Sequence, residues 1–214
     1  MELTRIVNIQ TSRSYLYTVE NYFPSEYAKI LFEKCKQLDL EVEPQMKMGT
    51  AHRCVGFFSD VSEGYQFSGQ TAKSSPLPEF LKTFLTVVNQ SLKTEFNRLL
   101  INYYRDGTDS IGSHPDEEKD LYGNKVAAIT LMNDGGTRIF RIRAGKNLSL
   151  QSIPGLQTIQ KISPSGLFID VLSRNNQLLV MGGDFQKEFK HEIPAEKSNK
   201  NAERISITLR YHSK

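Results

Sequence analysis

The heptapeptide RISITLR, residues 204–210, alternates between polar and apolar side chains at every position. Successive side chains on a β-strand point to opposite faces, so the aliphatic residues share one face and the polar residues share the other. An arginine stands at each end of the polar face, Arg204 and Arg210. The segment is too apolar for an exposed edge, and an unpaired buried charge costs about 3–5 kcal/mol. The pattern predicts a buried strand that binds an anion, and a small dianion would suit both arginines.

Further β-rich segments precede this strand in the second half of the chain, and clusters of Gly, Asn, Asp and Pro separate them. They are LLINYY (99–104), KVAAITLM (125–132), TRIFRIR (137–143), LFIDVL (167–172) and QLLVM (177–181). Residues 144–166, rich in Ser, Gln, Pro and Gly, predict a long surface loop.

Two earlier segments have the periodicity of amphipathic helices. PSEYAKILFEKCKQL, residues 24–38, and LPEFLKTFLTVVNQSLKTEF, residues 77–96, each repeat apolar residues at helical spacing. Both helices could cover one sheet. Helices followed by strands predict an α+β fold, and a length of 214 residues favours one domain, residues 1–214.

Composition restricts the class of protein only loosely. The formal net charge of +3 suits contact with a polyanion without requiring one. Two cysteines, Cys35 and Cys54, make no disulfide framework, so a reducing compartment is expected. Neither a run of about 18 apolar residues nor a secretory signal is present. We therefore expect an intracellular protein of the nucleus or cytoplasm, without membrane contact.

A cluster of possible metal ligands follows the strand LLINYY. His114 and Asp116 form an H-x-D triplet, and His191 stands about 75 residues later, ahead of the R-x5-R strand. Two histidines and one carboxylate are the ligands of the facial triad that holds Fe(II) with open positions. A surface turn of solvated charges with His191 as an ordinary loop histidine is the alternative interpretation. The order of the motifs favours iron together with a dicarboxylate, 2-oxoglutarate.

Four ordered motifs resemble the AlkB family of Fe(II)- and 2-oxoglutarate-dependent dioxygenases, nearest to its eukaryotic-type DNA repair members. The resemblance covers about residues 44–210 and is carried by LLINYYRDGTDSIGSHPDEEKDL (99–121), QLLVMGGDFQKEFKHEIP (177–194), RISITLRY (204–211) and YQFSG (65–69). It implies a double-stranded β-helix, or jelly roll, over residues 99–212, with flanking N-terminal helices. Residues 44–70 would form a segment that recognises nucleic acid.

The resemblance also assigns roles to individual residues. His114, Asp116 and His191 would bind Fe(II) and form the catalytic centre. Arg210, with Asn102 and Tyr104 beside it, would hold the distal carboxylate of 2-oxoglutarate, and Arg204 would lie near the metal-proximal end. Substrate contacts would come from Tyr65, Phe67, Ser68 and Glu118.

The resemblance implies that the protein is an oxidative demethylase. Such an enzyme, which we expect to be a monomer, uses dioxygen and 2-oxoglutarate to remove methyl groups from bases such as 1-methyladenine and 3-methylcytosine in DNA or RNA. The base must leave the duplex to be reached. The alternatives are an AlkB-fold module that only binds nucleic acid and a dioxygenase that modifies protein side chains.

Two segments depart from the family pattern. Where a duplex-acting relative has an aromatic or apolar finger, this chain has Gln45, Met46 and Met48, which weakens the case for duplex preference. The insertion NDGG, residues 133–136, suggests a longer hairpin near the cleft.

A basic strand face follows that insertion. Arg141 and Arg143 alternate on one face of the predicted strand, with Lys146 beyond them and Lys187 and Lys190 later in the chain. We expect this face to contact the phosphates of nucleic acid, and solvated surface charge is the alternative.

Overall fold

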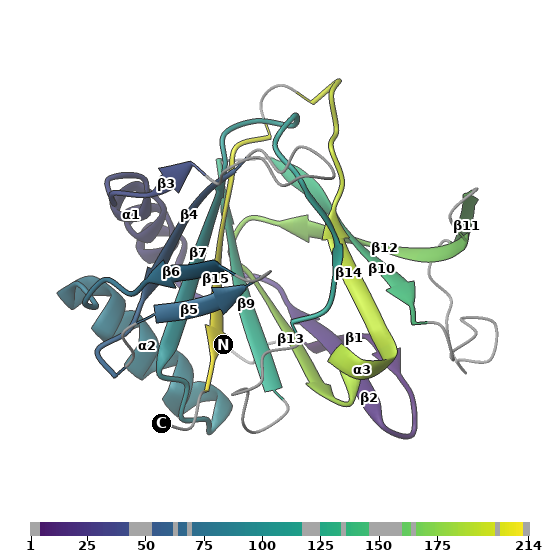
Figure 1. Ribbon diagram of the computed structural model, residues 1–214, viewed down its shortest axis with the longest axis horizontal. Helices are drawn as coiled ribbons and strands as arrows, with labels where there is room; N and C mark the ends of the chain where they lie inside the picture. The colour runs from purple at the N-terminus through teal and green to yellow at the C-terminus, as the bar shows by residue number, and fades with distance from the viewer. Residues whose placement is uncertain are drawn as a thin grey trace.

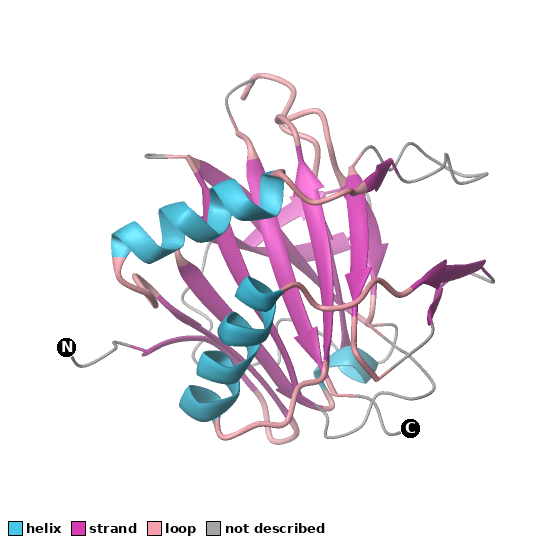
Figure 2. Cartoon of the chain, turned by 90° about the vertical axis from the view of Figure 1, so that its left-hand side faces the viewer, coloured by secondary structure: helices cyan, strands magenta, loops and turns pink. Residues whose placement is uncertain are grey.

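The computed structural model describes residues 5–42, 53–61, 64–67, 70–116, 125–133, 136–145, 160–163, 166–199 and 202–211. Two antiparallel sheets face one another, and two helices cover the outer face of the larger sheet (Figures 1 and 2). The arrangement has three layers: helices, larger sheet and smaller sheet. It is the α+β sandwich that the sequence and the family resemblance predicted.

Eight strands form the larger sheet, in the order β1-β2-β13-β9-β15-β7-β4-β3. Their bounds are β1 Arg5–Gln10, β2 Ser14–Val19, β13 Gln177–Gly183, β9 Lys125–Met132, β15 Arg204–Arg210, β7 Arg98–Tyr104, β4 Cys54–Phe58 and β3 Glu41–Val42. The predicted strand at 204–210 lies between β7 and β9, and all of its seven residues are buried. Its central place explains why both of its faces avoid water.

Five strands form the smaller sheet, in the order β11-β12-β10-β14-β8. Their bounds are β11 Gln160–Ser163, β12 Gly166–Arg174, β10 Thr137–Ala144, β14 Phe189–Ile193 and β8 Ile111–His114. A short helix, α3 (Phe185–Glu188), connects β13 to β14 and so joins the two sheets. A separate hairpin pairs β5 (Gly64–Phe67) with β6 (Gln70–Lys73).

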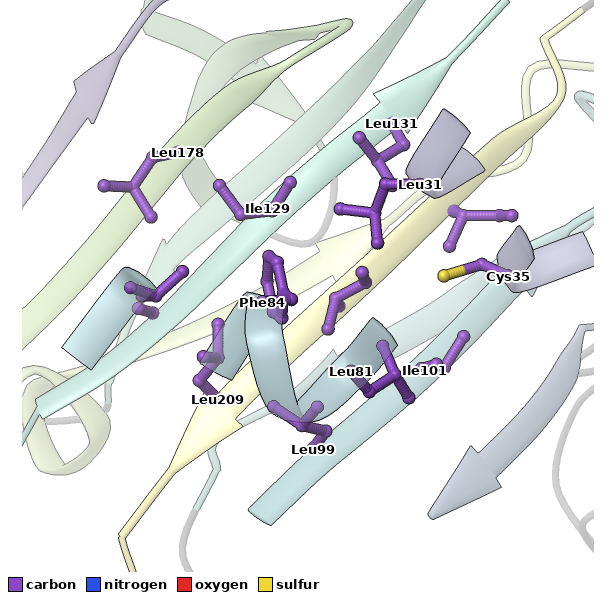
Figure 3. Close-up of a cluster of buried hydrophobic side chains, with 14 of the residues drawn as sticks. Leu31, Cys35, Leu81, Phe84, Leu99, Ile101, Ile129, Leu131, Leu178 and Leu209 are labelled. Atoms are coloured by element: carbon purple, nitrogen blue, oxygen red, sulfur yellow. The ribbon is translucent and has the colours of Figure 1, made fainter. Parts of the chain in front are cut away.

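Both predicted helices are confirmed, as α1 (Ser25–Lys36) and α2 (Glu79–Leu92). The second helix ends earlier than the pattern suggested because Lys93 adopts a left-handed conformation, with φ of 51°. Leu31 and Cys35 of α1 and Phe84 of α2 pack on the aliphatic face of the larger sheet (Figure 3). No helix in the described part of the chain combines the length and the apolar character needed to cross a membrane.

The two sheets enclose a second core. It joins residues of the larger sheet, such as Leu16 and Leu179, to Phe140, Ile142 and Ile169 of the smaller sheet. Apolar contact between the layers therefore fixes how the sheets face one another. The polar residues at one end of this interior are thereby held in a largely water-free place.

Three features differ from the sequence-based expectations. The strands β1 and β2 were not predicted, although they form one edge of the larger sheet. The expected loop at 144–166 contains β11, which pairs with β12. The NDGG segment is not the turn of a β-hairpin, because β9 lies in the larger sheet and β10 in the smaller one. The link between them crosses from one layer to the other.

Replacing Phe84 by Ala tests the packing of α2. Phe84 is fully buried, and its ring centroid lies 5.8 Å from that of Phe23. Loss of the Phe84 ring therefore leaves a cavity. We expect the free energy of unfolding, measured by urea denaturation, to fall by about 3–5 kcal/mol. Val87 on the same helix is 40% exposed, so Val87→Ala is the matched control and should have little effect. Equal losses in the two variants would contradict this packing.

Candidate active site

Two histidines lie side by side at one end of the smaller sheet. His114 ends β8 and pairs directly with His191 of β14, and their ring centroids are 4.6 Å apart. Asp116 lies two residues after β8, with its carboxylate oxygens 3.9 Å from His114 Nε2 and 3.7 Å from His191 Nε2. One potential ligand atom from each residue lies within 4.8 Å of the other two. The fold thus brings the three predicted metal ligands together.

Both imidazoles are prepared to bind a cation. His114 Nδ1 lies 2.8 Å from the Gly112 carbonyl oxygen, so Nδ1 carries the proton and the lone pair of Nε2 faces the site. Burial lowers the pKa of His191 to about 3, against the opposing effect of Asp116. The His191 ring stacks on Phe140 at a centroid distance of 5.2 Å. A neutral imidazole is the form that binds metal ions.

Asp116 is held from two directions. Its side chain is 5% exposed, and Arg210 Nη2 donates to Oδ1 at 2.5 Å. Burial favours the protonated carboxyl, but Arg210 and the two histidines outweigh it and lower the pKa of Asp116. Its backbone N–H donates to Gln186 Oε1 at 2.9 Å. Asp116 therefore offers an ionised carboxylate in a fixed place.

Arg204 forms a second polar centre between the sheets. It is 3% exposed, and burial lowers the pKa of its guanidinium to about 10. Its Nη2 donates to Thr130 Oγ1 at 3.1 Å, and the Tyr104 ring lies 5.2 Å away. Its Nε and Nη1 are buried without a hydrogen-bond partner among the described residues. A buried cation with unused donors needs an anion.

The places of the two arginines are the reverse of the sequence-based expectation. We expected Arg210 beside Tyr104 and Arg204 near the metal, but the register pairs Arg204 with Tyr104 and Arg210 with Arg98. Arg210 contacts Asp116 and is the arginine at the metal end. The alternation within β15 identified both residues. It could not determine which end of the strand meets the histidines.

Asn102 lies between these two centres on β7, opposite Ser206 of β15. Arg53, which is also buried, donates from Nε to Asn102 Oδ1 at 2.8 Å. This bond fixes the orientation of the Asn102 amide. Arg53 carried no signal that identified it from the sequence.

Thr130, Phe140 and Gln186 were missed as well. Thr130 had a usable signal, because it is the one polar residue in the apolar segment VAAITLM, residues 126–132. Phe140 and Gln186 had none that sequence alone reveals.

Arg141 and Arg143, which we expected to contact phosphates, both pair with carboxylates in the structure. Arg141 donates to both carboxylate oxygens of Asp170, at 2.7 and 3.0 Å. Arg143 donates to Glu192 at 2.9 Å, and Glu192 also lies 3.7 Å from Arg141. Both acids stand on the strands that flank β10, so two arginines meet two carboxylates. Strand pairing, invisible in the local pattern, neutralises this face.

Part of the expected substrate site lies outside the described residues. These are Ser68, Glu118, the finger residues Gln45, Met46 and Met48, and Lys146. Tyr65 and Phe67 both belong to β5, where Tyr65 pairs with Ala72 and Phe67 pairs with Gln70 of β6. Lys187 is exposed, and its Nζ donates to Asp184 Oδ1 at 3.0 Å.

Comparison with known proteins agrees with the fold and the ligand geometry. The family model of the 2OG-Fe(II) oxygenase superfamily matches residues 15–210. Because the match spans most of the chain, the protein belongs to that superfamily. Fe(II) and 2-oxoglutarate are its cofactors.

Individual relatives support the resemblance to the AlkB family that the motifs indicated. DNA oxidative demethylase ALKBH2 of Bos taurus is 27% identical over 154 residues, 72% of this chain and 50% of the relative. Alpha-ketoglutarate-dependent dioxygenase alkB homolog 3 of Mus musculus is 27% identical over 148 residues, 68% of this chain and 47% of the relative. The chain therefore spans about half the length of these relatives.

Solved structures share the fold. OsALKBH1 superposes with a TM-score of 0.60 at 15% identity, covering 95% of this chain and all of the other. A prolyl-4-hydroxylase of Pseudomonas putida gives a TM-score of 0.55 at 16% identity, covering 93% and 92% of the two chains. These likenesses confirm the double-stranded β-helix.

The side chains present fit both cofactors. Two imidazoles and one ionised carboxylate suit Fe(II) and leave positions free for other ligands. The unused donors of Arg204 suit a carboxylate at the other polar centre.

Substituting Asp116 by Ala tests the ligand set. Loss of the only carboxylate in the cluster should weaken Co(II) binding by at least about 100-fold, more than losing a residue that merely supports a ligand. Calorimetric titration of the metal-free protein measures the affinity. Asp39→Ala, in the exposed loop after α1, is the control and should bind Co(II) normally. Normal binding by Asp116→Ala would refute the assignment.

The low pKa of His191 predicts an acid-sensitive metal-free protein. Because the folded state keeps His191 neutral to about pH 3, the unfolded state binds more protons below about pH 6.5. The free energy of unfolding should therefore fall with pH below 6.5, by up to about 1.4 kcal/mol per unit. His191→Gln should flatten this slope between pH 6.5 and 4.5. Identical slopes would show that His191 does not titrate as described.

Proposed function

We propose that the protein is an oxidative demethylase that removes methyl groups from nitrogen atoms of nucleic-acid bases such as 1-methyladenine and 3-methylcytosine. The observation that carries the proposal is the cluster of His114, Asp116 and His191 in a chain related to ALKBH2 and alkB homolog 3. DNA is the proposed polymer because the ALKBH2 relative is named for it.

The chain's own residues would divide the work between the two polar centres. His114, Asp116 and His191 bind Fe(II), while Arg204 and Tyr104 bind the distal carboxylate of 2-oxoglutarate. When bound, these cofactors couple decarboxylation of 2-oxoglutarate to hydroxylation of a C–H bond by dioxygen. Arg210 keeps Asp116 ionised and holds one of its oxygens, which leaves the other for the metal. Phe140 and the sheet around His191 exclude water from the buried side.

A hydroxylated N-methyl group needs no further help from the protein. The hydroxymethyl carbon loses the bond to nitrogen as its hydroxyl becomes a carbonyl, which releases formaldehyde and returns the proton to the base. The reaction therefore requires no protein nucleophile. It does require that the methyl group reach the three ligand residues from their accessible side, where the His114 side chain is 34% exposed.

Recognition of the base is assigned to Tyr65, Phe67, Ser68 and Glu118. A methylated base would leave the stack, and damage that prevents normal pairing lowers the cost of its extrusion. Phe67 would stack on the base, with Tyr65 and Ser68 bonding nearby. Glu118 would accept a hydrogen bond from an exocyclic amine, which favours adenine and cytosine over bases without one.

Turnover on defined oligonucleotides tests the proposal. Single- and double-stranded DNA with one 1-methyladenine or 3-methylcytosine should yield formaldehyde and the unmodified base, with both cofactors present. The matched RNA oligonucleotide shows which polymer is preferred. Cofactor consumption without formaldehyde from any oligonucleotide would defeat the nucleic-acid proposal and favour a protein substrate.

Arg204→Lys tests the role of the buried guanidinium. Lysine keeps the charge but loses the planar pair of donors, so the KM for 2-oxoglutarate should rise about tenfold or more. Steady-state kinetics measure it, with Arg174→Lys as the control because the Arg174 side chain is 53% exposed. An unchanged KM would place the carboxylate elsewhere.

A further inference from the structure

Asp116 lies beyond the end of its strand and depends on another segment for support. The strand β8 ends at His114, so the sheet provides no ladder bond for the backbone of Asp116. Its N–H donates to the side chain of Gln186 in α3, with N and Oε1 2.9 Å apart. A buried backbone N–H must find an acceptor, and here the acceptor is a side chain distant in sequence.

The orientation of the Gln186 amide is determined on both sides. Its Nε2 group points to the sulfur of Met181, at 3.5 Å, which can only accept a hydrogen bond. Its Oε1 therefore faces the Asp116 N–H, which can only donate. The two contacts assign the amide without ambiguity, and rotating it would lose both.

The helix that carries Gln186 is anchored at its two ends by the turn between β1 and β2. Arg13 pairs with Asp184 just before α3, with Nε and Oδ2 2.7 Å apart, and the Arg13 carbonyl accepts from the Asp184 N–H at 3.0 Å. At the other end, Ser14 Oγ donates to Glu188 at 2.5 Å. Phe185 within the helix is fully buried. A four-residue helix is thus given a fixed position by tertiary contacts.

A glycine allows this turn to approach closely. A Cβ at Gly183 would lie 2.0 Å from the Arg13 carbonyl oxygen, and Gly183 has φ of +68°. Because the clash is with the backbone, a side chain at this position would push the turn away from α3. Gly183 therefore belongs to the support of the helix.

We propose that Gln186 is a positioning residue for Asp116, and that α3 with the β1–β2 turn forms the platform on which it acts. Gln186 touches no reacting group; it fixes the backbone from which the Asp116 carboxylate projects. Substituting a residue that supports a metal ligand in this way typically weakens metal affinity by 10- to 100-fold. The inference rests on Asp116 as a metal ligand but not on the identity of the substrate.

The test compares Gln186→Leu with Gln186→Glu. Leucine has a similar volume but no acceptor, so the Kd for Co(II) should rise about tenfold or more. Glutamate keeps an acceptor oxygen, and its Kd should stay within about threefold of the unaltered protein. In the metal-free protein, the amide proton resonance of Asp116 should move upfield in Gln186→Leu and remain in place in Gln186→Glu. Lys187→Leu, on the exposed side of α3, is the matched control.

Each outcome decides the proposal. Normal Co(II) affinity in Gln186→Leu, or an Asp116 amide resonance that does not move, overturns it. Equal losses of affinity in the leucine and glutamate variants, with equal falls in Tm, also overturn it, because they indicate packing alone. If Gln186→Leu does not fold, Gln186→Glu serves as the test. A move of the Asp116 amide proton resonance in that variant would contradict the proposal. Failure of Asp116→Ala to weaken Co(II) binding would instead reject the ligand assignment.

Discussion

The ion pair between Asp116 and Arg210 connects the two layers of the protein at the metal end. Asp116 follows a strand of the smaller sheet and Arg210 ends a strand of the larger one, and both are buried. Charges in such a place persist only when each has a partner. Fe(II) and 2-oxoglutarate carry opposite charges of equal size, so the two cofactors together add no net charge.

The strand β15 shows how one segment serves both packing and chemistry. Its aliphatic face packs beneath α1 and α2, and its polar face carries Arg204 and Arg210 into the space between the sheets. Both roles were predictable, because a period of two residues is a local property of the sequence. The two helices and five other strands were predictable because helical spacing and β-rich composition are also local properties. The three ligands were found because the H-x-D triplet and a later histidine precede the paired arginines.

What remained hidden depended on contacts between distant segments. The direction of β15 relative to the histidines decided which arginine lies near the metal, and no local pattern records it. Asp170 and Glu192 neutralise the arginines of β10 only because their strands flank it. The strand β2, with sequence SYLYTV, has the alternation of a strand, yet its role appears only when its turn meets α3. Gln186 is important through one backbone contact, which composition and spacing do not reveal.

The support of the metal site therefore extends well beyond the three ligands. Gly112, Phe140 and Gln186 each contact one ligand residue. They come from three different elements, so the geometry of the site depends on the sandwich as a whole. This dependence explains why residues far apart in the chain can hold a small cation in a defined place.

Anomalous diffraction from an anaerobic crystal grown with Mn(II) and 2-oxoglutarate tests the central claim most directly. The account predicts one strong manganese peak within coordination distance of His114 Nε2, an Asp116 carboxylate oxygen and His191 Nε2. It also predicts one carboxylate of 2-oxoglutarate on the guanidinium of Arg204. A peak away from this cluster, or 2-oxoglutarate bound without contact to Arg204, would contradict it.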